Sequence, residues 1–240
     1  MKTDDLDIVY IVRPGESNEE LRYSLRSVAK NFPHRNIFIA GYKPSWVKNV
    51  TPIPVHQTGT KYQNAEANWQ AAMADNRISR NFVLFNDDFF ILQPVTELPN
   101  YHRGKLADVI AHYHELQPGG AYVTNMARTA QMLDKLGVKQ QAQFSYALHV
   151  PMIMNREKRQ LLYRISELLN PEKRDIQMRT LYGCFYRIGG IEIKDVKLSK
   201  VEHTPTGGET FLSSLDNSFK NGKVGTYLRN TFTEKCRYEL

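Results

Sequence analysis

The sequence has few cysteines and no long apolar run, and each lack excludes a class of protein. Cys184 and Cys236 are the only cysteines among 240 residues, too few for a disulfide framework or a cysteine-based zinc site. No apolar stretch approaches the roughly 20 residues of a membrane-spanning helix. The N-terminal residues contain no apolar signal segment. We therefore expect a cytoplasmic protein without a membrane span.

The sequence also lacks internal repeats, low-complexity tracts and a clean linker. Its composition, with 41% hydrophobic and 24% charged residues, is typical of a folded chain. One domain with an elaborated C-terminal part is the expected organisation. We place the α/β core in residues 1–100 and a more helical part of the same domain in residues 101–240.

Acidic residues are fewer than basic ones, which leaves a net charge of +7. Most of the excess lies in residues 156–240. Excess positive charge suits an anionic partner such as a diphosphate, a polyanionic acceptor or a nucleic acid. An ordinary solvated surface explains it equally well.

Strand and helix signals alternate over the first ninety residues. Apolar runs predict strands, and helical periodicity after Ser17 or Asn18 and again before Asp75 predicts helices. This alternation indicates right-handed crossovers and a Rossmann-type, mainly parallel sheet flanked by helices. The expected strands are 7–13, 36–41, 50–56 and 82–85, and the expected helices are 18–31 and 63–75.

The remainder of the chain is predicted to be more helical. An extended segment is expected near 146–154, and the alternating residues 191–198 predict a strand. The expected helices are 103–116, 123–136, 156–169 and one that begins at Pro171 and continues through Tyr186.

Two adjacent carboxylates, Asp87 and Asp88, interrupt the apolar run from Phe82 to Leu92. Carboxylates at the end of a buried strand are costly unless a cation lies beside them. Mg²⁺ or Mn²⁺ prefers such hard oxygen ligands, and a metal-bound diphosphate would complete the site. A strand followed by an acidic turn is the alternative interpretation.

Polar or charged segments follow three of the predicted strands, at 13–15, 41–43 and 86–88. Ligands of parallel α/β sheets gather beyond the carboxyl ends of the strands. We therefore expect these segments to meet in one crevice.

The segments 7–10, 18–27 and 44–47 resemble the opening blocks of the Stealth family of sugar-phosphate transferases, and 85–89 resembles its acidic block. His149-Val-Pro resembles a later block of that family. The core is also similar to GT-A glycosyltransferases, in which the acidic motif binds the metal of a nucleotide-diphosphate sugar. An acidic residue usual after the first strand of the Stealth family is absent here, which favours sugar transfer over sugar-phosphate transfer.

The resemblance and the pattern together predict the site residues. Asp88, with Asp87 and His149, is expected to hold Mg²⁺ or Mn²⁺, and His149 could instead serve as an acid or base. Asp175 is a candidate base for the acceptor hydroxyl, although an ordinary ion pair with Arg179, one turn along the same helix, is the favoured interpretation. The predicted donor-binding residues are Arg13, Arg22, Lys61, Asn64, Asn68 and Asp87.

Three functions follow as hypotheses. The first is a metal-dependent glycosyltransferase that moves a sugar from a nucleotide-diphosphate donor to a glycan, a cell-wall polymer or DNA. The second is transfer of sugar 1-phosphate, which the Stealth resemblance implies. The third is a non-catalytic nucleic-acid-binding protein. The sequence disfavours it, because the basic residues form no stripe with interleaved aromatic residues.

Overall fold

The computed structural model describes residues 1–172 and 175–240. Two compact units divide the chain, the first formed by Met1–Leu98, His149–Arg156 and Val196–Leu240 and the second by Pro99–Leu148 and Glu157–Asp195. The C-terminal residues therefore return to the unit in which the chain begins. Among the described residues, no helix is both long enough and apolar enough to cross a bilayer.

A five-stranded sheet in the order β3-β2-β1-β4-β7 forms the centre of the first unit. Strands β3, β2, β1 and β4 are parallel, and β7 joins β4 antiparallel. The mainly parallel α/β sheet predicted from the sequence is confirmed. The strands are β1 (Asp7–Val12), β2 (Ile37–Gly41), β3 (Thr51–Pro54), β4 (Asn81–Asn86) and β7 (Met152–Asn155).

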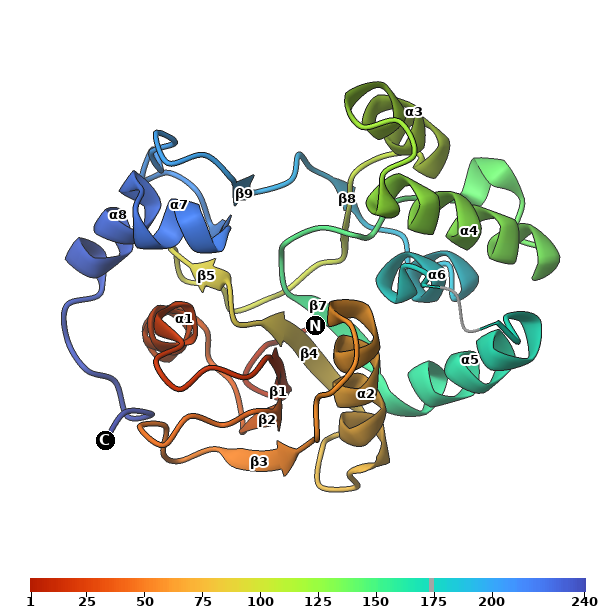
Figure 1. The fold of residues 1–240 in the computed structure, drawn as a ribbon. Coiled ribbons are helices and arrows are strands. Elements are labelled where there is room, and N and C mark those ends of the chain that lie inside the picture. Colours follow the sequence, from red (N-terminus) through yellow and green to blue (C-terminus); the bar gives the residue numbers. More distant parts are fainter. Residues whose placement is uncertain (173–174) are drawn as a thin grey trace. The chain divides into compact units, whose positions relative to one another are not determined.

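Helices α1 (Glu19–Asn31) and α2 (Lys61–Ala74) connect these strands. The chain moves from β1 to β2 in one direction along the sheet and from β3 to β4 in the other. Right-handed crossovers, the rule for such connections, place the two helices on opposite faces, and Figure 1 shows them on either side of β1 and β4. Leu21, Leu25 and Val28 form the buried stripe of α1, as its periodicity predicts.

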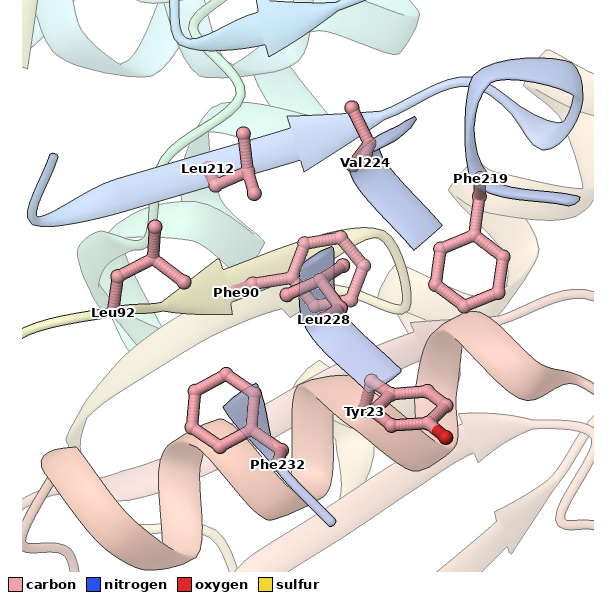
Figure 2. Close-up of a cluster of buried hydrophobic side chains, with 8 residues drawn as sticks. All are labelled: Tyr23, Phe90, Leu92, Leu212, Phe219, Val224, Leu228 and Phe232. Atoms are coloured by element: carbon pink, nitrogen blue, oxygen red, sulfur yellow. The ribbon is translucent and has the colours of Figure 1, made fainter. Parts of the chain in front are cut away.

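A second, three-stranded sheet in the order β5-β10-β9 continues from β4. It brings β5 (Phe89–Ile91) beside β10 (Phe211–Ser214) and β9 (Lys197–Leu198). Helices α7 (Asp216–Lys220) and α8 (Lys223–Thr231) follow β10. Side chains from α1, β5, β10, α7 and α8 form one apolar cluster that fastens the C-terminal segment to α1 (Figure 2). The cluster contains Tyr23, Phe90, Leu92, Leu212, Phe219, Val224, Leu228 and Phe232.

The second unit is mostly helical. Its short parallel pair is β6 (Tyr101–His102) and β8 (Ile191–Glu192). The backbone of α6 approaches Tyr146 closely, because a Cβ at Gly183 would lie 2.3 Å from the Tyr146 ring. Its helices are α3 (Leu106–Leu116), α4 (Ala121–Lys135), the 3₁₀ turn η1 (Gln140–Ala142), most of α5 (Arg156–Leu169) and α6 (Met178–Phe185).

Two of the expected elements differ from the structure. The helix expected from Pro171 begins only at Met178, because the Gln177 N–H donates to Thr129 Oγ1 at 2.8 Å, outside any helical pattern. The part of that prediction that falls on Lys173 and Arg174 lies outside the described residues. The strand expected over 191–198 is split into β8 and β9, because its two ends pair with different sheets.

Candidate active site at the carboxyl edge of the sheet

The candidate site lies where β1 and β4 end side by side. Ile11 of β1 is in register with Asn86 of β4, so Arg13 and Asp87 leave neighbouring parallel strands at the same edge. The chain after β1 turns towards β2, while β4 lies on the opposite flank of β1. Such a reversal is the topological switch point at which open α/β sheets bind ligands. The expected meeting of these strand ends is present for Arg13 and Asp87.

Asp87 is held by residues that follow β1. The Asn18 amide donates from Nδ2 to Asp87 Oδ2 at 2.9 Å, while its Oδ1 caps α1 by accepting from Leu21 N at 3.1 Å. Arg13 Nε lies 4.0 Å from the same Asp87 oxygen. One cap residue thus ties the start of α1 to the acidic turn.

Asp88 is held by the second sheet. Lys197 Nζ lies 3.0 Å from Asp88 Oδ2, and the Ser213 hydroxyl donates to the same oxygen at 3.2 Å. The strand register explains both contacts, because Ser213 pairs with Phe89 on one side and with Lys197 on the other. Since both partners use Oδ2, neither occupies Oδ1 of Asp88.

Two further carboxylates, Glu20 and Asp216, join the cluster through Arg13. Arg13 Nη2 lies 3.3 Å from Glu20 Oε2 and also forms an ion pair with Asp216. The Ser214 hydroxyl donates to Glu20 Oε1 at 2.7 Å. Arg13 therefore bridges the ends of β1, α1 and β10.

Negative charge is in excess at this edge. Burial, together with the charges of Asp88, Asp87 and Asp216, raises the pKa of Glu20 from 4.5 to about 7. Burial and the neighbouring Asp88 raise the pKa of Asp87 from 3.8 to about 6, although Asn18 and Arg13 oppose the shift. The local carboxylates thus exceed what Arg13 and Lys197 neutralise, which makes the edge suited to an added cation.

The carboxylate oxygens at this edge suit a metal ion that takes its remaining ligands from a substrate. Within residues 1–172 and 175–240, no group of three or more His, Cys, Asp or Glu side chains is arranged to hold a metal ion unaided. Mg²⁺ is commonly bound by one or two carboxylates, with waters and substrate phosphates completing the shell. Asp87 and Asp88 can supply such a pair of oxygens.

His149 lies close to the acidic turn. Its ring meets the ring of Phe89, the residue after Asp88, edge-on with 6.3 Å between centroids. This contact places His149 in the neighbourhood predicted for it, and a role as ligand, acid or base stays a prediction.

The predicted donor residues of α2 lie along one side of the site. Asn68 is buried and donates from Nδ2 to Val12 O at 3.4 Å, at the end of β1, while its Oδ1 has no hydrogen-bond partner. Asn64 instead binds the backbone of Gly59 through both Oδ1 and Nδ2. Thr60, one residue before α2, caps the helix, so Asn64 is not needed as its cap. Lys61 is exposed in the first turn of α2.

Arg22 lies in a separate structural cluster. Its guanidinium stacks on Trp46, with 4.5 Å from Cζ to the ring centroid, and Nε lies 3.8 Å from Glu239 Oε2. The neighbouring Arg26 forms a buried bidentate pair with the same Glu239. These contacts give Arg22 a structural role beside Trp46 and Glu239, and its role as a donor contact stays a prediction.

Asp175 belongs to the second unit. It precedes α6 and is not helical. The expectation that Asp175 and Arg179 lie one turn apart on the same helix is therefore wrong, because the helix begins three residues after Asp175. Its use as a base stays a prediction.

Sequence reasoning missed Glu20, Lys197, Ser213, Ser214 and Asp216. A usable signal existed for Glu20, because a helix that follows a parallel strand places its first turn at the carboxyl edge of the sheet. The other four arrive through the pairing of β10 with β5 and β9.

Comparisons with known proteins show only distant likeness. No family model and no curated protein matches the chain, so the Stealth resemblance stays a prediction. Among solved structures, glycosyltransferase GlyE of Streptococcus pneumoniae TIGR4 is 11% identical with a TM-score of 0.39, over 96% of this chain and 50% of that chain. Its apo form is 9% identical with a TM-score of 0.28, over 72% of this chain and 44% of that chain. The present chain thus spans half or less of these proteins, and likeness at this level carries no functional argument.

Proposed function

We propose that this chain is a glycosyltransferase that uses a nucleotide-diphosphate sugar together with Mg²⁺ or Mn²⁺. The observation that carries the proposal is the concentration of Asp87, Asp88 and Glu20 at the switch point between β1 and β4. Excess carboxylate at a ligand-binding edge is costly unless a cation compensates it.

Asp88 and Asp87 would hold the metal, with His149 as a further candidate ligand. When bound, the metal would supply Lewis-acid stabilisation of the charge that grows on the leaving diphosphate. Burying these carboxylates without a cation is unfavourable. Binding of the metal together with the diphosphate would neutralise the charges at this edge, and the relief of that cost would favour substrate binding.

The cationic side chains would orient the donor. Arg13 has 56% of its side-chain surface exposed, so it can reach a phosphate oxygen without losing its place beside Asp87. Lys197 approaches from the second sheet and adds charge next to Asp88. Asn68 offers its unpaired Oδ1 near the end of β1, and Lys61 would bring a cation to the start of α2.

The acceptor side is assigned more coarsely. A base must remove the proton of the acceptor hydroxyl in an inverting reaction, and His149 and Asp175 are the candidates. The acceptor would be a glycan, a cell-wall polymer or DNA, because excess positive charge in residues 156–240 suits an anionic polymer.

A product assay tests the proposal. The protein is incubated with Mn²⁺, candidate acceptors and nucleotide sugars that carry a label in the β-phosphate. Glycosyl transfer releases the label as nucleoside diphosphate, whereas transfer of sugar 1-phosphate leaves the label on the acceptor and releases nucleoside monophosphate.

Asp88→Asn is the variant to compare in this assay, and Asp108→Asn, at an exposed position of α3, is its matched control. Loss of product with Asp88→Asn alone is the expected result. Salt-sensitive DNA binding that survives Asp88→Asn, with no donor turned over, would instead favour a non-catalytic nucleic-acid-binding protein.

A further inference from the structure

A second hollow lies in the first unit at the amino ends of β2 and β3. Its volume is about 400 Å³, within the range of small-molecule sites. Residues at or next to the starts of β2 and β3 line it together with residues near the C-terminus. The side chains that matter here are Arg35, Asn49, Thr51, Arg237 and Tyr238.

The hollow is on the opposite edge of the sheet from Asp87 and Asp88. Asp87 follows the carboxyl end of β4, whereas Asn36 and Thr51 lie at the beginnings of β2 and β3, which run parallel to it. A strand of this length separates the two edges by about 15–20 Å. The hollow is therefore a different site from the proposed donor crevice.

Two arginines without a carboxylate partner line this hollow. Arg35 and Arg237 are exposed and take part in no ion pair among the residues that the structure describes. Other arginines of the same unit are paired with acids, as Arg77 is with Asp75 and Arg229 is with Glu19.

Asp7, the first residue of β1, lies at the same edge of the sheet and is hydrogen-bonded to neutral groups. Both carboxylate oxygens of Asp7 accept hydrogen bonds, from Asn36 and from Ser79. Among the residues that the structure describes, Asp7 forms no ion pair with Arg35 or Arg237.

Hydrogen bonds hold the Arg237 side chain in place. Arg237 Nε donates to Tyr238 Oη at 2.8 Å, and Arg237 Nη2 lies 3.2 Å from His34 Nε2. Asn49, which adopts a left-handed φ of 55°, donates from Nδ2 to Arg237 O at 2.6 Å. These contacts orient the guanidinium without neutralising it, which lowers the entropy lost when an anion binds.

We infer that this hollow binds a phosphate group, either free phosphate or the phosphate of a small phosphorylated metabolite such as a sugar phosphate. Guanidinium groups match phosphate oxygens with paired, charge-assisted hydrogen bonds. The Thr51 hydroxyl offers a further donor at the rim. The volume exceeds what inorganic phosphate needs, which favours a phosphate that carries an organic group.

Calorimetric titration of the full chain with inorganic phosphate, a hexose phosphate and the unphosphorylated hexose tests this inference. Both phosphates are expected to bind saturably, and the hexose alone is expected not to bind. Tighter binding of the hexose phosphate would identify the metabolite as the source, and equal affinity would identify free phosphate.

Arg35→Gln is the first variant, because the exposed Arg35 side chain takes part in no hydrogen bond or ion pair among the described residues. Its phosphate affinity is expected to fall at least tenfold, while Arg77→Gln, which alters an exposed and paired arginine, keeps the affinity of the wild type. Arg237→Gln, checked for folding by circular dichroism, should show the same loss as Arg35→Gln. Absence of saturable phosphate binding, or equal affinities in Arg35→Gln and Arg77→Gln, would overturn the inference. Neither result bears on the donor crevice.

Discussion

Lys197 Nζ lies 3.0 Å from Asp88 Oδ2, although 109 residues separate the two in the sequence. This ion pair joins the second sheet to the acidic turn that follows β4. It also places a protein cation beside the carboxylate that we propose as the first metal ligand, so the charge of Lys197 would oppose a metal ion bound at the other oxygen, Oδ1.

Lys197→Met is therefore expected to tighten Mn²⁺ binding in the absence of donor. Removal of the competing cation should lower the Mn²⁺ dissociation constant about two- to fivefold, in line with the value of a partly exposed ion pair. Isothermal titration with Mn²⁺ measures the change, and Lys200→Met, at an exposed position outside the cluster, is the control. Weaker Mn²⁺ binding in Lys197→Met would contradict the assignment of Asp88 as the ligand.

Glu20 is expected to make stability depend on pH. Its folded-state pKa of about 7 exceeds the ordinary 4.5, so the folded state holds more protons than the unfolded state between these values. Stability contributed at this site is then lost as the pH rises from about 4.5 to about 7. Asp87, with a pKa of about 6, acts in the same direction.

The Glu20→Gln variant has no ionisable group at this position, so it does not lose stability through this site as the pH rises. Relative to the wild type, the variant should gain about 1–3 kcal/mol of unfolding free energy between pH 5 and pH 8. Urea unfolding at several pH values measures it. A difference between the two proteins that does not change with pH would show that Glu20 titrates normally.

The buried pair of Arg26 and Glu239 is expected to behave as a unit. Arg26 Nε lies 2.7 Å from Glu239 Oε1 and Nη2 lies 2.9 Å from Oε2. Either Arg26→Met or Glu239→Gln leaves an uncompensated buried group and should cost about 3–5 kcal/mol. The double variant should cost clearly less than the sum of the two, and additive losses in a double-mutant cycle would disprove the coupling.

Gly225 is expected to tolerate no side chain. A Cβ there would lie 1.8 Å from Phe219 O, between α7 and α8, whereas a Cβ at Gly15 would meet nothing within 4 Å. Gly225→Ala should lower the unfolding free energy by about 1–3 kcal/mol, and Gly15→Ala should leave it nearly unchanged. Thermal unfolding compares the two, and equal stabilities would show that α7 and α8 do not pack as described.

The first four parallel strands and their helices could be predicted because their signals are local. Asn18 caps α1 and Phe32-Pro33 follows its end, and each apolar run had strand length. The helix over 156–169 matches α5 at both ends. The meeting of Arg13 with Asp87 followed from one rule about parallel strand ends, which needs no knowledge of the rest of the chain.

The remainder depends on contacts between distant residues, which periodicity does not encode. β9 and β10 are short. β10 pairs with β5, more than a hundred residues earlier, and β9 pairs with β10. Lys197, Ser213 and Asp216 reach the site only through that pairing. Residues 175–177 stayed out of a helix because Thr129 of α4 binds Gln177 N, a tertiary contact that overrides the local signal.

The central claim is that Asp87 and Asp88 bind a nucleotide-diphosphate sugar through a divalent metal. Isothermal titration of a panel of nucleotide sugars, with and without Mn²⁺, into wild-type protein and Asp88→Asn tests it most directly. At a donor concentration of 100 times its Kd, binding would also add about 2.7 kcal/mol to stability. Binding of a donor by the wild type only when Mn²⁺ is present, and lost in Asp88→Asn, is the predicted result. Metal-independent binding that is equal in both proteins would contradict the account.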